Sequence, residues 1–133
     1  MTLALVLHAG LATGTEQPAI EEVRIPMPDG VRLAADIHWP SDPAATGRFP
    51  VLLTYSPYRK DESRSGSHAW FSYFLDHGYA VVRVDIRGTG RSEGVTVPYE
   101  DSDIELDDGE VVIDWLSRQP WSTGKVGMFG LSW

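Results

Sequence analysis

The pattern of apolar and polar positions divides the chain into a β-hairpin followed by alternating strands and helices. Two short runs rich in β-branched residues, at 20–26 and 31–39, flank a Pro-Asp-Gly sequence that favours a tight turn, and together they predict the hairpin. Residues 40–50 are rich in Pro, Ser, Asp, Ala and Gly, which predicts a loop. The apolar run at 51–55 is typical of a strand that is buried on both faces of a sheet.

After that strand the periodicity alternates between helical and extended. Apolar residues recur at helical spacing within 68–77, and Gly78 stands where a C-terminal cap is expected. The runs at 79–85 and 126–129 predict two more buried strands, and residues 101–119 predict a second helix between them. Alternating strands and helices indicate an α/β fold with a mostly parallel sheet, whose functional residues are expected at the carboxyl ends of the strands.

The second predicted helix opens with a dense acidic run and closes with a basic residue, Arg118, which suits the dipole of a helix. We expect the acidic run to be a solvated first turn and not a metal site. Gly109 weakens the helix prediction locally. The acidic residues are Asp101, Asp103, Glu105, Asp107 and Asp108.

Length and composition indicate one globular domain. The chain has 133 residues, of which 42% are hydrophobic and 11% aromatic, so it can bury a sizeable core. Its formal net charge of -8 argues against nucleic acid and anionic membranes as partners, because both bind clusters of Lys and Arg. The absence of Cys excludes disulfides, thiolate metal sites and a cysteine nucleophile.

Residues 1–19 predict a leader without fixed structure. Their apolar stretch is short, no Lys or Arg precedes it, and no clean small-x-small cleavage site follows it, so a signal peptide is the weaker interpretation. We therefore favour a cytoplasmic protein, with secretion as the alternative. No later apolar run approaches the roughly 20 residues that a membrane-spanning helix needs.

The glycine-dense loop at 88–94 resembles a dinucleotide-binding GxGxxG turn but departs from it twice. Its third glycine comes one residue late, and a further loop follows where a helix should hold the pyrophosphate. The loop also fails as a phosphate-binding P-loop, because Asp85 stands where the first glycine should be and Arg91 replaces the lysine. A nucleotide-binding domain is therefore a weak alternative.

A second glycine-containing motif, Gly130-Leu131-Ser132-Trp133, follows the last apolar run. A serine hydroxyl needs a base to become a nucleophile, and a tight turn between a strand and a helix is one way to expose it. Gly130, two residues before Ser132, allows the close backbone approach that such a turn requires. Gly-x-Ser also occurs in plain turns, so this motif indicates a catalytic serine only in combination with other motifs.

Four stretches occur together along the chain: VRIPMPDGVRLAADIHWP, VLLTYSPYRK, DIRGTGRSEG and WSTGKVGMFGLSW. In this order and spacing they resemble the cocaine esterase and X-Pro dipeptidyl-peptidase (CocE/NonD) family of serine hydrolases, and they cover about residues 23–133. The resemblance implies that residues 20–133 form the N-terminal part of an α/β-hydrolase domain, truncated at the nucleophile elbow.

The resemblance also implies roles for individual residues. Ser132 matches the nucleophile, and the Tyr58 hydroxyl and the main-chain N–H of Trp133 match the two donors to the oxyanion. Tyr55 is the competing tyrosine, but it ends the apolar strand and is expected to be packed. The family's D-x-R-G-x-G loop, for which we expect a structural bracing role, matches Asp85, Arg87, Gly88 and Gly90.

The acid and the histidine of the triad follow the serine in this fold, so they are expected downstream of Ser132. Residues 1–133 by themselves are therefore expected to be inactive, because loss of the activating base lowers the rate by orders of magnitude. The histidines that precede Ser132 are expected to have surface or capping roles. They are His8, His38, His68 and His77.

The function implied by the resemblance is hydrolysis of an ester or amide through an acyl-enzyme, with no cofactor and no metal. The expected partner is a small-molecule ester or a peptide, such as an acyl ester or an X-Pro dipeptidyl substrate. The alternative from another class is a non-catalytic truncated remnant or a partner-binding module.

Overall fold

The computed structural model describes residues 20–40, 47–61, 68–96, 98–100 and 102–130. The predicted leader at 1–19 therefore lies outside the described residues. The predicted order of a hairpin followed by strand, helix, strand, helix and strand is confirmed. The elements are β1 (Ile20–Pro26), β2 (Arg32–His38), β3 (Phe49–Ser56), α1 (His68–Asp76), β4 (Ala80–Asp85), α2 (Asp103–Ser117) and β5 (Ser122–Met128).

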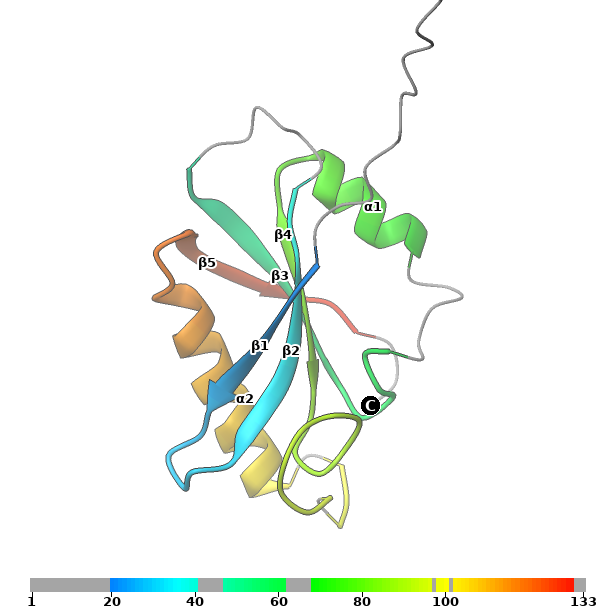
Figure 1. Ribbon diagram of the computed structural model, residues 1–133, viewed down its shortest axis with the longest axis vertical. Helices are drawn as coiled ribbons and strands as arrows, with labels where there is room; N and C mark the ends of the chain where they lie inside the picture. The colour runs from blue at the N-terminus through cyan, green and yellow to red at the C-terminus, as the bar shows by residue number, and fades with distance from the viewer. Residues whose placement is uncertain (1–19, 41–46, 62–67, 97, 101, 131–133) are drawn as a thin grey trace, which may run out of the picture.

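The five strands form one mixed sheet in the order β1-β2-β4-β3-β5. The hairpin strand β2 pairs antiparallel with β4, whereas β3 pairs parallel with both β4 and β5. The carboxyl ends of β3, β4 and β5 therefore meet at one edge of the sheet. Figure 1 shows the segments that follow β3 and β4 at this same, lower end of the molecule.

The two helices cover opposite faces of the sheet. Successive residues of a strand point to opposite sides, so β3 and β4 supply apolar side chains to both faces. On one face, Leu52 and Val81 pack against Phe71 and Leu75 of α1. Figure 1 shows α1 and α2 on opposite sides of the strands. The larger cluster lies under α2 and the hairpin and includes Ile25, Leu33, Ile37, Val51, Leu53, Val82, Val84, Val112 and Leu116.

Local turn chemistry sets two of the connections, as the sequence predicts. In the Pro-Asp-Gly turn of the hairpin, Gly30 donates its N–H to the Met27 carbonyl at 3.0 Å. At the end of α1, Gly78 adopts φ = +80°, a conformation in which other residues are strained. The N–H of Tyr79 then donates back to the Phe74 carbonyl at 3.0 Å, which closes the helix.

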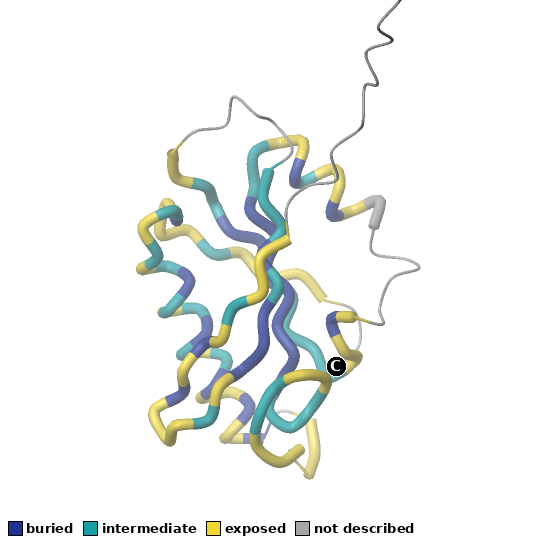
Figure 2. The backbone as a smooth tube through the Cα atoms, viewed as in Figure 1, coloured by how far each residue is buried: buried dark blue, intermediate teal, exposed yellow. Residues whose placement is uncertain are grey.

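The last strand departs from the prediction in length and in burial. We expected a strand buried on both faces at 126–129, but β5 begins at Ser122 and most of its residues are exposed (Figure 2). The residues before Val126 have turn composition, but they join the strand because Ser122 pairs with Phe49. Phe49 lies in the predicted loop at 40–50, so β3 also begins earlier than predicted. Among the described residues β5 has a partner strand only on the β3 side, which leaves Met128 56% exposed.

The acidic run at the start of α2 is only partly solvated, so the expectation of a solvated first turn is wrong for two of its residues. Glu105 and Asp108 are buried. Asp108 accepts two hydrogen bonds from the Arg87 guanidinium, at 2.7 and 2.8 Å, and these bonds raise the pKa of Arg87. Ser102 caps the helix by accepting the N–H of Glu105 at 3.3 Å. The helix accommodates Gly109 because the Tyr55 ring packs over it, 3.5 Å from where a Cβ would lie.

The buried ion pair predicts a stability difference between two aspartates of α2. Asp108→Asn is expected to lower the free energy of unfolding by about 1–3 kcal/mol, because it removes the charge that faces the Arg87 guanidinium. Asp114→Asn is the matched control. Asp114 pairs with Arg118 at 2.7 Å on the surface, where the side chains are 53% and 77% exposed. Its substitution is expected to change stability by less than about 0.5 kcal/mol. Urea denaturation measures both, and equal losses would contradict the role of Asp108.

Candidate active site

Tyr58, the predicted oxyanion donor, lies just after the carboxyl end of β3. The residue is 49% exposed, and its main-chain N–H donates to the Ser56 hydroxyl at 3.1 Å. A small hollow opens beside it. The residues that line this hollow are Thr54, Ser56, Tyr58, Arg59, Lys60, Arg83 and Val84.

Tyr55, the competing tyrosine, is packed as expected. Its hydroxyl donates to the main-chain carbonyl of Glu105 on α2 at 3.1 Å, so its hydrogen is already used inside the fold. Burial raises the pKa of Tyr55, and the charges of Asp108 and Glu105 add to this effect. Of the two tyrosines, Tyr58 is the one that is largely exposed to solvent.

Asp85 lies at the end of β4, and its side chain is fully buried. One carboxylate oxygen accepts the main-chain N–H of Lys60 at 2.6 Å, and the other accepts that of Arg91 at 2.9 Å. A buried carboxylate needs such donors to replace water. Asp85 therefore connects the segment that carries Tyr58 to the glycine-dense loop.

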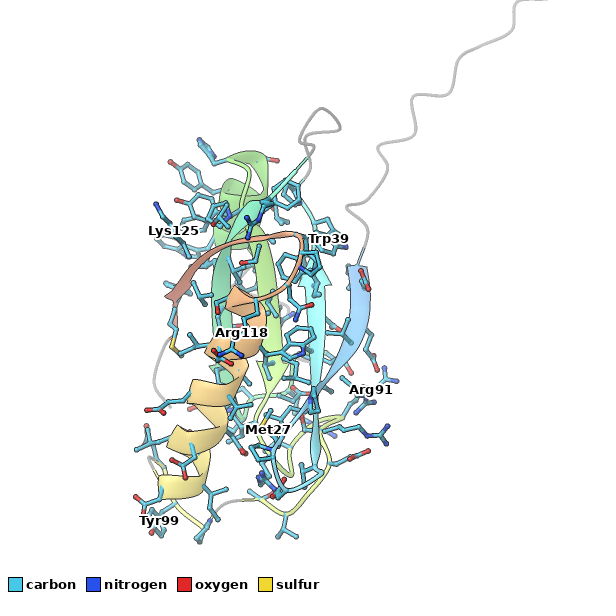
Figure 3. The ribbon with its side chains drawn as sticks, turned by 90° about the vertical axis from the view of Figure 1, so that its left-hand side faces the viewer. Met27, Trp39, Arg91, Tyr99, Arg118 and Lys125 are labelled. Atoms are coloured by element: carbon cyan, nitrogen blue, oxygen red, sulfur yellow. The ribbon has the colours of Figure 1, made fainter. Side chains whose placement is uncertain are left out.

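The glycine-dense loop is shaped by contacts within this fold. At Gly90 a Cβ would lie 2.1 Å from the Asp85 carboxylate, so only glycine fits. The Ser92 hydroxyl donates to the Asp85 carbonyl at 2.6 Å and accepts the N–H of Ala34 at 2.8 Å, which docks the loop on the hairpin. Figure 3 shows Arg91 beside β1, where its guanidinium pairs with Glu22 at 2.8 Å. The expected bracing role of this loop is thus visible in its hydrogen bonds.

The same loop lacks the context of a nucleotide site. Between β4 and Ser102, the described residues contain no helix, so none presents an N-terminus to a pyrophosphate at the end of the loop. The glycines serve the approach of the loop to Asp85 and to the chain at Val95 and Thr96. These contacts disfavour the nucleotide-binding alternative.

Lys60 is a residue of this site that the sequence did not identify. Its side chain is 1% exposed, and its ammonium group donates to Asp36 at 2.8 Å and to Asp61 at 3.1 Å. Burial acts to lower the pKa of Lys60, but the hydrogen bonds to both aspartates outweigh it, so the pKa is raised. The surrounding YRKDES sequence has the composition of a solvated loop, and no local signal shows that Asp36 on β2 will face the ammonium group.

The described histidines lie on or next to the elements where the sequence placed them. His77 follows α1, and its Nδ1–H donates to the Tyr73 carbonyl at 2.6 Å, which confirms a capping role. His38 lies on β2, where it is half-buried and stacks on Phe71 at a ring separation of 6.5 Å, so the surface position expected for this histidine is wrong. His68 begins α1, whereas His8 lies outside the described residues. Within the part of the chain that the structure describes, no group of three or more His, Asp or Glu residues could hold a metal ion.

The predicted nucleophile Ser132 and the predicted donor Trp133 lie outside the described residues. The chain that leads toward them is described as far as Gly130. There, the N–H of Phe129 donates to the Leu53 carbonyl at 2.9 Å, which continues the pairing of β5 with β3. The chain after β5 therefore leaves the sheet at the same edge as the chain that carries Tyr58.

Comparison with known proteins matches this architecture to hydrolases. Residues 29–133 match the X-Pro dipeptidyl-peptidase (S15 family). Cocaine esterase from Rhodococcus sp. (strain MB1 Bresler) is 42% identical over 114 residues, which are 84% of this chain and 19% of that protein. A putative Xaa-Pro dipeptidyl-peptidase from Streptomyces avermitilis is 32% identical over 77% of this chain and 20% of its own length. The chain thus spans about a fifth of the length of these relatives.

Solved structures agree with the sequence relatives. A CocE/NonD family hydrolase from Staphylococcus aureus superimposes with a TM-score of 0.69 at 28% identity, covering 82% of this chain and 22% of its own. An alpha-amino acid ester hydrolase gives a TM-score of 0.70 at 33% identity, covering 95% of this chain and 23% of its own. Within the residues that the structure describes, no helix is long and apolar enough to cross a membrane. The chain has part of the α/β-hydrolase fold and belongs to the X-Pro dipeptidyl-peptidase (S15) family.

Proposed function

We propose that this chain supplies the nucleophile and the oxyanion donors of a serine hydrolase that cleaves an ester or an amide. Ser132 is the nucleophile, and the Tyr58 hydroxyl and the Trp133 N–H are the donors. One observation carries the proposal: β3 and β5 are parallel neighbours, so the segments that bear Tyr58 and Ser132 leave the sheet at the same edge. The exposed position of Tyr58 at that edge supports its role.

The proposed chemistry follows from these positions. The Ser132 oxygen attacks the substrate carbonyl, whose π electrons move onto its oxygen, and the hydroxyl proton passes to a base. Tyr58 and the Trp133 N–H donate to the resulting oxyanion, which stabilises the tetrahedral intermediate. Collapse of the intermediate expels the alcohol or amine with a proton and leaves an acyl-enzyme, which water then hydrolyses. The base and the acid of the triad are not assigned to residues of this chain.

The substrate class is proposed from the chemistry that the relatives' names share. Cocaine esterase, alpha-amino acid ester hydrolase and X-Pro dipeptidyl-peptidase each name an ester or a peptide bond. We therefore assign a small-molecule ester or a peptide, with an acyl ester and an X-Pro dipeptidyl peptide as the candidates. The proposed reaction needs no cofactor, and we retain a cytoplasmic location as part of the proposal.

Covalent labelling tests the nucleophile. A fluorophosphonate probe is expected to label Ser132 of the full-length protein, because an activated serine attacks the phosphorus as it would a carbonyl. Ser132→Ala is expected to abolish labelling and hydrolysis of p-nitrophenyl acetate. Ser117→Ala, which removes a hydroxyl that donates to Asp114 on α2, is the control and should keep both. Mass spectrometry locates the label, and a label on another serine would refute the assignment of Ser132.

Kinetics test the tyrosine. Tyr58→Phe is expected to lower the acylation rate by about 10²- to 10³-fold, because one of two oxyanion donors is lost. The KM should change little, since the oxyanion forms only in the transition state. Tyr55→Phe is the control: it removes a hydroxyl that is bonded inside the fold, and its acylation rate should stay within about twofold. Stopped-flow kinetics measures the acylation rate of both variants. An unchanged rate in Tyr58→Phe would mean that Tyr58 does not donate to the oxyanion.

A further inference from the structure

The segment that carries Tyr58 is short, irregular and held at both ends. On one side of Tyr58, the Ser56 hydroxyl accepts the Tyr58 main-chain N–H at 3.1 Å. On the other side, Arg59 has φ = +62°, the only positive φ of a non-glycine residue among those described. Such a conformation costs on the order of 1 kcal/mol and persists only where neighbouring contacts enforce it. The contacts next to Arg59 therefore help to determine where Tyr58 lies.

Lys60 supplies those contacts from both its main chain and its side chain. Its N–H donates to the buried Asp85 carboxylate at 2.6 Å. Its ammonium group, on a side chain that is 1% exposed, donates to Asp36 on the hairpin strand β2 at 2.8 Å. An ammonium group in such a place is stable only with charged acceptors around it, so the lysine and Asp36 hold each other in position. This connects the loop after β3 to both β4 and β2.

The ammonium group is poorly suited to direct chemistry. Two of its three hydrogens are used by Asp36 and Asp61, and the Glu22 carboxylate lies 3.6 Å away. Its raised pKa keeps it protonated, which excludes a role as a general base near neutral pH. It also lies beneath the surface, whereas Tyr58 is 49% exposed. The function that remains for Lys60 is to hold the backbone.

We propose that Lys60 is a positioning residue for the oxyanion donor: its buried ammonium group and its main-chain N–H fix the backbone that presents the Tyr58 hydroxyl. The inference rests on the proposed function, in which Tyr58 donates to the oxyanion. A donor that is displaced by about 1 Å can lower the rate by about 10²-fold, because stabilisation of the transition state depends on geometry that is set in advance. Asp36 and Asp85 act with Lys60 as the acceptors that hold it.

A double-mutant cycle in the full-length protein tests this inference. Lys60→Met keeps the length of the side chain and removes its charge, and it is expected to lower kcat about 10- to 100-fold with little change in KM. When Tyr58 is already Phe, the same substitution should lower kcat less than about twofold further, because Lys60 acts through the Tyr58 hydroxyl. Lys60→Arg, which keeps the charge, should recover part of the loss. If Lys60→Met lowers kcat by the same factor in the Tyr58→Phe background as in the wild type, the proposal is overturned.

Lys125→Met is the matched control. This lysine is exposed on β5 (Figure 3), so its substitution should leave kcat within about twofold. The variant Asp36→Asn/Lys60→Met removes both charges together and avoids a buried unpaired aspartate, which keeps the protein folded if Lys60→Met alone is unstable. It should show the same loss of kcat as Lys60→Met, and wild-type kcat in this folded variant would overturn the proposal.

Hydrogen exchange separates failure of this inference from failure of the proposed function. In Lys60→Met, the main-chain amides of Tyr58, Arg59 and Lys60 are expected to exchange at least about tenfold faster than in the wild type. Unchanged exchange would overturn the anchoring role, whatever the kinetics show. Exchange that accelerates in Lys60→Met, together with unchanged acylation in Tyr58→Phe, would mean that Lys60 holds the segment but that Tyr58 is not the donor. In that case the proposal that Lys60 serves the oxyanion is refuted together with the role of Tyr58.

Discussion

The carboxylate of Asp85 is the contact on which the edge of the sheet depends. It is fully buried at the end of the central strand β4, where an ionised group is stable only if donors replace its water. The donors come from two loops, the N–H of Lys60 after β3 and the N–H of Arg91 after β4. The approach is so close that a Cβ at Gly90 would lie 2.1 Å from the carboxylate. One side chain thus sets the relative positions of both loops.

Two ion pairs extend this constraint to the rest of the fold. Lys60 connects the loop after β3 to Asp36 on the hairpin, and Arg87 connects the loop after β4 to Asp108 on α2. In each pair both side chains are largely buried, so removal of one partner weakens a contact that water cannot readily replace. The loops at the carboxyl edge are therefore held from the hairpin, from β4 and from α2. A proposed oxyanion donor on such a loop needs little rearrangement when charge develops on the substrate.

Features that depend on a few adjacent residues could be predicted from the sequence. Features that depend on a partner far away in the chain could not. The Pro-Asp-Gly turn and the Gly78 cap follow from backbone preferences of a few adjacent residues. The residues from Ser122 to Lys125 have turn composition, yet they extend β5 because β3 lies beside them. The acidic run of α2 shows the same limit, since Asp108 is buried against a guanidinium that lies 21 residues earlier in the chain.

The sequence by itself determined the order of strands and helices, the two turns, the absence of cysteine chemistry and the motifs that place the chain in its family. Only the tertiary structure decided that the Tyr55 hydroxyl donates to the Glu105 carbonyl of α2, and that Lys60 is buried against Asp36. The physical reason is that periodicity and turn preferences act between neighbours in the chain. Burial and charge pairing depend on strand order, and here the crossover that places β4 between β2 and β3 brings these groups together.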